Sequence, residues 1–250
     1  MHHLIKDTEF QEIFKVLSQI KGIHKRNIER LRNFIEAVCY ALRTGCQWRL
    51  LPTEYGSWRA VHKRFKQWSD KNIWEYLFEN VKKDPDMENA MIDATVARAH
   101  ACAAGYGKDS QEKEALGRSR GGFSTKIHAL CDALGLPLKF ILTPGQDHDI
   151  TQAAVLTGDI FDAHLLADTG YDSDDFRNYL KNKNCVPVIP PRRNRVRQHE
   201  YDEFLYEDRS KIECFFGKIK HFRRVFVRYE KAAKTFLSFL HFTGALIWLR

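Results

Sequence analysis

Three carboxylates in the second half of the chain stand where this type of side chain has a chemical use. Asp93 interrupts an apolar, strand-like run, where a carboxylate needs a partner or a cation to offset its desolvation. Asp168 directly follows the apolar run 165–167, and sites in α/β sheets form at the carboxyl ends of strands. Glu213 lies in a stretch with helical spacing, followed by Phe215, Phe216 and Ile219, which we expect to pack inward.

The neighbours of Glu213 make this set more informative than isolated acids are. Tyr206, Arg209, Glu213 and Lys220 follow one another at intervals of three, four and seven residues, so their side chains stack on one helix face. An acid flanked by Arg and Lys on such a face can hold a metal ion while the cations contact phosphate. The same spacing also occurs as ordinary Arg–Glu pairs on solvated helices, and that alternative stays open here.

Other acids in this region have a simpler interpretation. Asp172, Asp174 and Asp175 precede a helical pattern, so we interpret them as solvated residues, with Asp172 or Ser173 capping the helix. Asp149 precedes another helical pattern, and we expect it to be an N-cap.

The hydrophobic pattern predicts the elements that position the carboxylates. Residues 90–97, 124–131 and 136–143 alternate as strands, and the last two are joined by a hairpin turn at 132–135. A helix at 150–157, a strand at 164–167, a helix at about 174–183, a strand at 186–190 and a long helical region follow. This order predicts a mixed α/β sheet covered by helices, with the polar stretch 105–122 as a loop.

The first third of the chain is different, because its apolar residues recur at helical spacing. Between residues 28 and 44 they form one stripe, and Gly45 follows as a helix stop. Ser57 and Asn72 are expected to cap two further helices, and the Asp84-Pro85-Asp86 segment interrupts the pattern. We therefore expect a small all-α domain over 1–84 and a second domain over 85–250.

Composition excludes several classes of protein. With 250 residues, 44% hydrophobic and 29% charged, the chain is not generally disordered. The net charge of +8 favours a polyanionic partner, and Lys and Arg concentrate at 209–234. Its six Cys form no CxxC pair, no Gly-rich segment fits a nucleotide site, and the apolar stretch 235–249 is too short for a membrane span. We expect a soluble, cytoplasmic protein without membrane contact or nucleotide cofactor.

The spacing of Tyr206, Arg209, Glu213 and Lys220 resembles the YREK signature of bacterial insertion-sequence DDE transposases. The surrounding sequence is similar to the insertion-sequence-five family, one of the wider insertion-sequence-four-like transposases. The similarity extends to residues 45–52, 93–95, 121–128, 145–149, 167–172 and 187–192, and so to nearly the whole chain.

This resemblance implies an RNase H-like mixed sheet flanked by helices, with Asp93, Asp168 and Glu213 as catalytic, metal-binding residues. The first and fourth strands are then neighbours and parallel, which brings Asp93 and Asp168 together. Hard Mg²⁺ ions suit carboxylates and phosphate oxygens, and we expect two ions per site, with Mn²⁺ as a substitute. The implied reaction is hydrolysis of a phosphodiester at the end of the element, followed by attack of the released 3′-hydroxyl on target DNA.

The resemblance also suggests which residues contact DNA. We expect Arg209 and Lys220 to contact phosphates near the scissile bond, with Lys126 as a further candidate. Tyr206 is expected to contact a terminal nucleotide, although a core tyrosine is an equal alternative. Arg192, Arg193, Arg195 and Arg197 form a cluster that is either a solvated basic loop or a track for the DNA backbone.

The expected partners are double-stranded DNA, as terminal inverted repeats and target, and further copies of this chain on that DNA. We expect the all-α domain, with Lys25, Arg26, Arg30 and Arg32, to help bind the terminal repeats. Two alternatives remain: an RNase H-like nuclease that cuts without joining, and a catalytically inactive, transposase-derived DNA-binding regulator.

Overall fold

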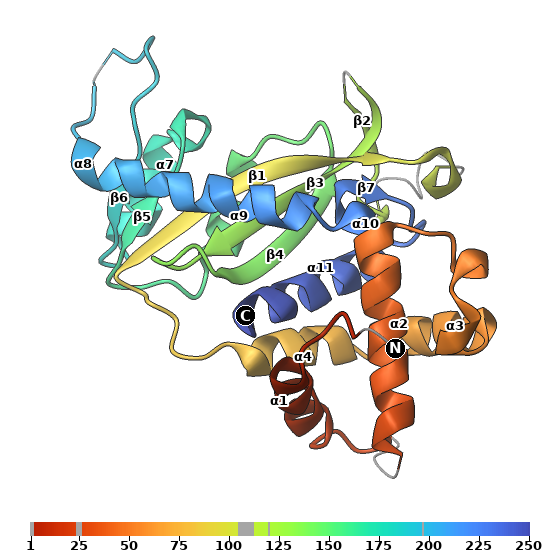
Figure 1. The fold of residues 1–250 in the computed structure, drawn as a ribbon. Helices are drawn as coiled ribbons and strands as arrows, with labels where there is room; N and C mark the ends of the chain where they lie inside the picture. Colours follow the sequence, from red (N-terminus) through yellow and green to blue (C-terminus); the bar gives the residue numbers. More distant parts are fainter. Residues whose placement is uncertain (1–2, 24–26, 105–112, 120, 197) are drawn as a thin grey trace. The chain divides into compact units, whose positions relative to one another are not determined.

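A computed structural model describes residues 3–23, 27–104, 113–119, 121–196 and 198–250 (Figure 1). The chain divides into two compact units. The first, here called the helical unit, comprises Met1–Lys83, His100–Gly105 and Ile219–Arg250. The second, the sheet unit, comprises Asp84–Ala99 and Tyr106–Lys218. Residues 219–250, which we expected in the second domain, thus group with the N-terminal helices.

The helical unit is built from amphipathic helices whose apolar stripes face a common core. Its elements are α1 (Asp7–Leu17), α2 (Ile28–Thr44), α3 (Trp58–Asp70), α4 (Ile73–Val81), α10 (Arg223–Phe226) and α11 (Ala233–Trp248), with short 3₁₀ turns η1 (Trp48–Leu50), η2 (Thr53–Tyr55) and η3 (Ala101–Ala103). The stripe predicted between residues 28 and 44 is buried in α2, and Ser57 and Asn72 precede α3 and α4 as expected. Neither residue makes a side-chain capping bond.

Aromatic side chains fill this core. Trp74 is fully buried, its indole nitrogen donates to the carbonyl of Phe65 at 3.4 Å, and its ring lies 4.9 Å from Phe242 of α11. Phe239 of α11 stacks on Phe65 with 4.3 Å between ring centroids. The apolar C-terminal stretch is therefore a core helix. Within the described part of the chain, every helix is too short or too polar to span a bilayer.

Gly45 ends α2 in the left-handed conformation, with φ 67°, as its place after the apolar stripe predicted. An added Cβ would lie 3.1 Å from the Cβ of Arg223. We expect Gly45→Ala to lower the free energy of unfolding by about 1–2 kcal/mol, because an L-residue is strained there. Urea denaturation measures the change. Gly22→Ala is the matched control, since Gly22 has φ 89° but open space around it; equal losses in both variants would exclude a contribution from the Arg223 contact.

The sheet unit has the mixed sheet that the alternating pattern predicted. Its strands are β1 (Asn89–Ala99), β2 (Gly117–Ser119), β3 (Gly122–Cys131), β4 (Pro137–Pro144), β5 (His164–Leu166) and β6 (Val186–Val188). β3 is antiparallel to β1, β2 and β4, whereas β5 is parallel to both β1 and β6. The parallel pairing of the first and fourth expected strands is thus confirmed. The expected loop at 105–122 is wrong in part, because residues 117–119 pair with β3; residues 105–112 and 120 lie outside the described ranges.

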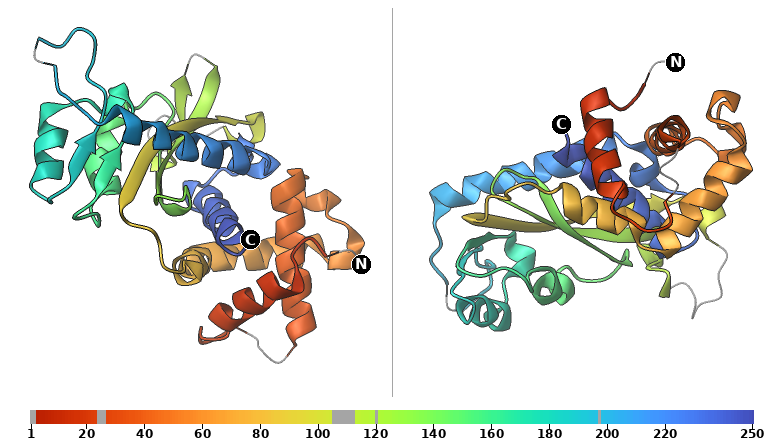
Figure 2. Two further views of the ribbon diagram at one scale, coloured as in Figure 1. Left: turned by 60° about the vertical axis from the view of Figure 1, so that its left-hand side comes forward. Right: turned by 90° about the horizontal axis from the view of Figure 1, so that it is seen from below.

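Helices cover both faces of this sheet (Figure 2). α6 (Ile150–Leu156) and α7 (Asp174–Lys181) pack on the face that carries Ile92 and Leu130. α9 (Ser210–Lys220) lies on the other face, where Phe215 stacks on Phe140 of β4 at 6.0 Å. Because side chains alternate along a strand, neighbours of Ile92 point toward α9.

Candidate active site

The sheet places Asp93 on the face that α9 covers. In the strand register Asp93 lies opposite Ala129, and Ala129 lies opposite Phe140. Directly opposed residues share a face, so Asp93 and Phe140 both point to the side where Phe215 packs. The apolar residues of α9 therefore fix a helix above a half-buried carboxylate.

Asp168 reaches the same region from the neighbouring strand. Met91 of β1 pairs with Leu166 of β5 in the parallel register. Asp93 and Asp168 each follow two residues later, so they stand at equivalent positions along the two neighbouring segments. The Asp168 side chain accepts a hydrogen bond of 2.8 Å from the backbone of Gly170, which holds it at the start of the 3₁₀ turn η4 (Thr169–Tyr171). This position is the carboxyl end of a parallel strand, as expected from the sequence.

Arg209 connects the third carboxylate to the first. Its Nη1 atom donates to Oδ2 of Asp93 at 3.0 Å, and its Nη2 atom donates to Oε1 of Glu213. Only 15% of the Arg209 side chain is exposed, compared with 58% of Glu213. The planar guanidinium can bridge two carboxylates in this way because its donors form a rigid fork.

The electrostatics of Asp93 show that negative charge gathers here. Burial raises the pKa of Asp93, and the charge of Asp168 adds to that rise. A hydrogen bond from the backbone of Ala94 and the positive charge of Arg209 act in the opposite direction without cancelling it. The site thus carries more negative charge than the single guanidinium of Arg209 neutralises.

This donor set fits a hard divalent cation in its chemistry, since all three acids present carboxylate oxygens. In the arrangement described, no three His, Cys, Asp or Glu side chains among the described residues come close enough to hold a metal ion. The positive charge between the carboxylates of Asp93 and Glu213 is instead that of the Arg209 guanidinium. A metal ion bound by all three acids therefore requires Arg209 to turn away from at least one of them.

Tyr171 is a residue of this site that sequence reasoning missed. Its side chain is fully buried, and within the described structure its hydroxyl has no hydrogen-bond partner. Burial raises its pKa, and the negative charges of Asp149, Asp93 and Asp168 raise it further. An aromatic residue three positions after a strand-end acid was the available signal, but such a residue is usually core.

We expect Tyr171→Phe to raise the free energy of unfolding by about 1 kcal/mol, because it removes a buried polar group that has no partner. Chemical denaturation measures this. Tyr179→Phe is the control, since the hydroxyl of Tyr179 donates to the carbonyl of Ala154 at 3.1 Å and its loss should lower stability. A clear loss of stability in Tyr171→Phe would contradict the prediction.

Tyr206 and Lys220 share one run of helical turns with Arg209 and Glu213. Tyr206 ends α8 (Glu203–Tyr206), Arg209 ends the 3₁₀ turn η5 (Glu207–Arg209), and Lys220 is the last, exposed residue of α9. The Arg209 guanidinium lies 5.9 Å from the Tyr206 ring. Burial raises the pKa of Tyr206, which Arg209 partly offsets.

Lys126 takes part in an ion pair. Its Nζ atom lies 2.8 Å from Oδ1 of Asp149 and donates to the carbonyl of Asp147, and its side chain is largely buried. The sequence predicted Asp149 as a helix cap. It does stand at the N-cap position of α6, but its side chain makes no capping bond and pairs with Lys126 instead. Lys126 thus stabilises the turn before α6 through its contacts with Asp147 and Asp149.

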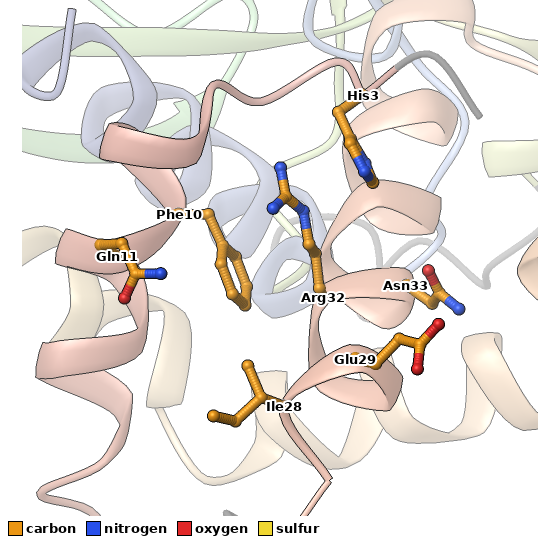
Figure 3. Close-up of a pocket in the computed structure, with 7 residues that line it drawn as sticks. All are labelled: His3, Phe10, Gln11, Ile28, Glu29, Arg32 and Asn33. Carbon is orange, nitrogen blue, oxygen red and sulfur yellow. The ribbon is translucent and has the colours of Figure 1, made fainter.

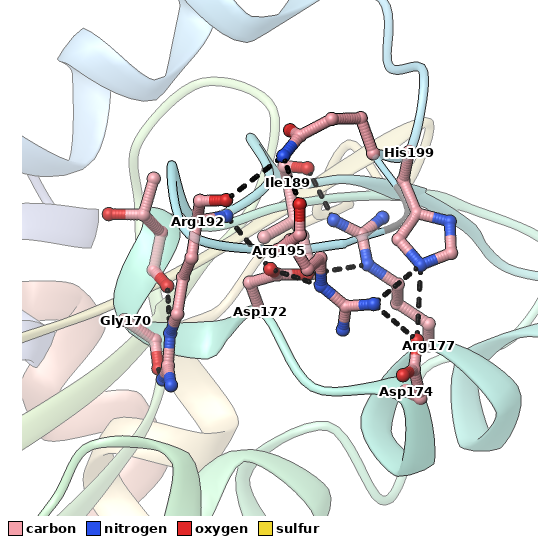
Figure 4. Close-up of polar contacts among 10 residues, drawn as sticks. Gly170, Asp172, Asp174, Arg177, Ile189, Arg192, Arg195 and His199 are labelled. Carbon is pink, nitrogen blue, oxygen red and sulfur yellow. Dashed lines mark hydrogen bonds and ion pairs between the residues drawn. The ribbon is translucent and has the colours of Figure 1, made fainter.

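The cluster of arginines surrounds a buried acid (Figure 4). Asp172 accepts hydrogen bonds from Nε of Arg177 at 2.9 Å, from Nε of Arg195 at 2.7 Å and from the backbone of Arg192 at 2.9 Å. Arg195 also pairs with Asp174. The Arg192 side chain donates to the carbonyls of Thr169 and Gly170, in the turn that holds Asp168.

The interpretation of Asp172 as a solvated residue is therefore wrong, whereas Asp174 is exposed to solvent as expected. The Asp172 side chain has no exposed surface and Asp174 pairs with both Arg195 and His199. Of the arginines expected on a DNA track, Arg193 is exposed, Arg195 is engaged with acids, and Arg197 lies outside the described residues. Arg177, five residues after Asp172, was the missed partner.

In the helical unit, Arg32 is also engaged. It pairs with Asp7 at 2.6 Å, and its guanidinium lies 5.0 Å from the Phe10 ring at a hollow of about 570 Å³ (Figure 3). Lys25 and Arg26 lie outside the described residues. Arg30 lines a different hollow, described below.

Comparison with known proteins agrees with this architecture. The family described as "Putative transposase of IS4/5 family" matches residues 5–78, and "Transposase DDE domain" matches residues 85–248. A Brucella ovis protein, "Putative transposase for insertion sequence element IS6501", is 40% identical over 129 residues, which are 51% of this chain and 99% of that protein. A Burkholderia cepacia protein, "Putative transposase for insertion sequence element IS402", is 32% identical over 154 residues, covering 57% and 70% of the two chains.

Among solved structures, a piggyBac transposase in a synaptic complex with hairpin DNA covers 96% of this chain and 71% of its own, with a TM-score of 0.55 at 10% identity. That likeness concerns the fold alone, and it confirms an RNase H-like mixed sheet with flanking helices after a helical N-terminal region. Because one family description covers most of the chain and the Brucella ovis relative is matched almost over its full length, this chain belongs to the transposase DDE domain family, as a DNA transposase of the insertion-sequence type.

Proposed function

We propose that the sheet unit cleaves the DNA strand at the ends of its own insertion sequence and joins the released 3′-hydroxyl to target DNA. The observation that carries this proposal is the approach of Asp93 from β1, Asp168 from the turn after β5 and Glu213 from α9 to one region, with Arg209 between two of them. Bringing carboxylates from three separate elements close together raises the free energy of their ionised forms. The arrangement therefore does not serve the stability of the fold.

In this proposal Asp93, Asp168 and Glu213 hold the divalent cation, Mg²⁺ or Mn²⁺, with two ions as our expectation. When bound, such ions activate an attacking oxygen and stabilise the leaving oxygen of a phosphodiester. Arg209 keeps the acids together before substrate arrives, and its guanidinium is then free to move onto a phosphate of the bound strand. The apolar contact between Phe215 and Phe140 keeps Glu213 over the sheet while Arg209 moves.

Further contacts to DNA are proposed for exposed cations. Lys220 lies two helical turns beyond Glu213 on α9, and Arg193 projects from the segment next to the Asp172 cluster. Arg192, Arg195 and Lys126 contribute mainly by holding the turns around Asp168 and Asp149, since their polar groups already have protein partners. Tyr206 contributes a ring beside Arg209 for a terminal nucleotide. Copies of the chain are proposed to associate on DNA, because two ends must be brought together.

The experiment uses the full chain and labelled duplexes that carry the terminal repeats flanking its gene, with Mg²⁺, with Mn²⁺ or with EDTA. We expect cleavage at the element end and joined products with either metal, and neither product from Asp168→Asn. Cleavage without joining would replace the proposal by a nuclease activity. Specific binding without chemistry in either metal would replace it by a DNA-binding regulator.

A further inference from the structure

The helical unit contains a hollow of about 850 Å³ that is lined by cations from three segments. Its basic residues are Lys21, Arg30, Lys63, Arg64 and Lys71, and no Asp or Glu is among the residues that line it. Apolar residues such as Leu31 and Trp68 form the rest of its wall. We call it the basic hollow. Several cations around one concavity repel one another unless an anion lies between them.

Arg64 lies against two aromatic rings in this hollow. Its guanidinium lies 4.3 Å from the centroid of the Phe34 ring and 5.0 Å from that of Trp68. Burial lowers the pKa of Arg64, and the neighbouring charge of Arg30 lowers it further. Stacking on aromatic rings orients a guanidinium but leaves its N–H donors without acceptors.

Arg32 and Arg224, two other arginines of the helical unit with little exposed surface, have acidic partners, whereas Arg30 and Arg64 of the basic hollow have none in the described part of the chain. Arg32 pairs with Asp7 at 2.6 Å, and Arg224 pairs with Glu230 at 2.7 Å. For Arg30 and Arg64 no ion pair with any described residue is found. A half-buried guanidinium next to another cation, without an acid, points to an anion supplied from outside the chain.

We propose that the basic hollow binds the phosphate backbone of duplex DNA. The cations are spread too widely for one phosphate: Lys63 of α3 and Lys71, which directly follows that helix, are eight positions apart, about 12 Å at the helical rise, a distance over which a DNA strand presents several phosphates. The lysines and Arg30 are exposed, as contacts to a backbone outside the protein require. The inference rests on the proposed function only in taking DNA as the partner, and it assigns that contact to named residues.

Such contacts are independent of sequence, so the test measures the salt dependence of binding. The double variant Lys63→Gln/Lys71→Gln removes two exposed cations of the hollow. The matched control Arg59→Gln/Lys66→Gln removes two exposed cations of the same helix that do not line it. Both pairs change net charge equally, and urea denaturation checks that both variants fold.

The probe is a fluorescein-labelled 20-base-pair duplex of arbitrary sequence, followed by fluorescence anisotropy in EDTA over a range of NaCl concentrations. We expect the slope of log K against log[NaCl] to become less steep by about 1.8 in the hollow variant, because each lost phosphate contact contributes about 0.9. Affinity should fall at least about tenfold at low salt, and the control should keep a slope within about 0.5 of the unmodified chain.

Two outcomes would overturn the inference. Equal slopes for the hollow variant and the control would mean that the cations act only through net charge. Binding of inorganic tripolyphosphate that the hollow variant loses, with unchanged affinity for the duplex, would assign the hollow to a small anion. Because the assay contains no divalent metal, its result is independent of catalysis. If the chain cuts end duplexes but the hollow variant binds DNA like the control, only this inference is wrong. If the hollow variant loses DNA binding as expected but the chain cuts no end duplex, only the catalytic proposal is wrong.

Discussion

Asp93→Asn should lower the rate of end cleavage by at least about 10³-fold, equivalent to about 4 kcal/mol in the activation free energy. Asparagine keeps the shape of the side chain but removes the charge that pairs with Arg209 and that, in the proposed function, holds a divalent cation. The rate is measured with saturating end duplex in single-turnover conditions, so that product release does not mask the chemical step.

Stability separates this loss from misfolding. Burial raises the pKa of Asp93, so the folded protein disfavours the ionised carboxylate at neutral pH. Asn is neutral at every pH, so the variant should unfold at the same or a higher urea concentration. Asp175→Asn, at an exposed position in the first turn of α7, is the control and should retain full activity. An active Asp93→Asn enzyme would remove Asp93 from the catalytic site.

The elements that carry the site could be predicted because each has a local cause. Alternating apolar residues predicted the strands that bear Asp93 and lead to Asp168, and the two strands are parallel neighbours as expected. The stripe that includes Phe215 predicted that α9 buries one face, and the apolar residues of that stripe are buried. That Asp93, Asp168 and Glu213 form one catalytic set was implied by the family resemblance, and it stays a prediction.

What could not be predicted were pairings between side chains far apart in the chain. Arg209 and Asp93 are separated by 116 residues, so no local pattern links them. Lys126 and Arg195 were expected to face DNA because cations near a phosphate-processing site usually do, but Asp149 and Asp172 lie within reach and engage them. Burial decides whether such a cation pairs with an acid of the protein or stays available to DNA. The burial of a polar residue in a turn depends on the packing of the whole sheet unit.

The Asp172 cluster provides the second large expected effect. Asp172→Ala should lower the free energy of unfolding by about 3–5 kcal/mol, because it leaves Arg177, with only 4% of its side chain exposed, without its carboxylate. Asp174→Ala is the matched control, since Asp174 is exposed, its pair with Arg195 is screened by solvent, and its loss should cost far less. Urea denaturation at pH 7 measures both, and equal costs would mean that the Asp172 cluster is not a buried network.

The cost should also depend on pH. Burial would raise the pKa of Asp172, but hydrogen bonds from the Arg192 backbone and from Arg195 and Arg177 outweigh it and lower the pKa below its usual value. A carboxylate with a depressed pKa stabilises the fold fully above its unfolded pKa of about 3.9, and that contribution is lost as the pH falls through the folded pKa. The difference between the unmodified chain and Asp172→Ala should therefore be constant from about pH 5 upward and shrink at lower pH.

Loss of Asp172 should reach the catalytic region as well. Asp172 fixes the backbone of Arg192, and the Arg192 side chain donates to the carbonyls of Thr169 and Gly170. The backbone of Gly170 in turn holds the Asp168 carboxylate. We therefore expect Asp172→Ala to reduce cleavage at temperatures where it is still folded, with the maximal rate reduced more than the affinity for the end duplex, whereas Asp174→Ala should leave both unchanged. A folded Asp172→Ala enzyme with normal cleavage would show that the turn around Asp168 keeps its geometry without the buried acid.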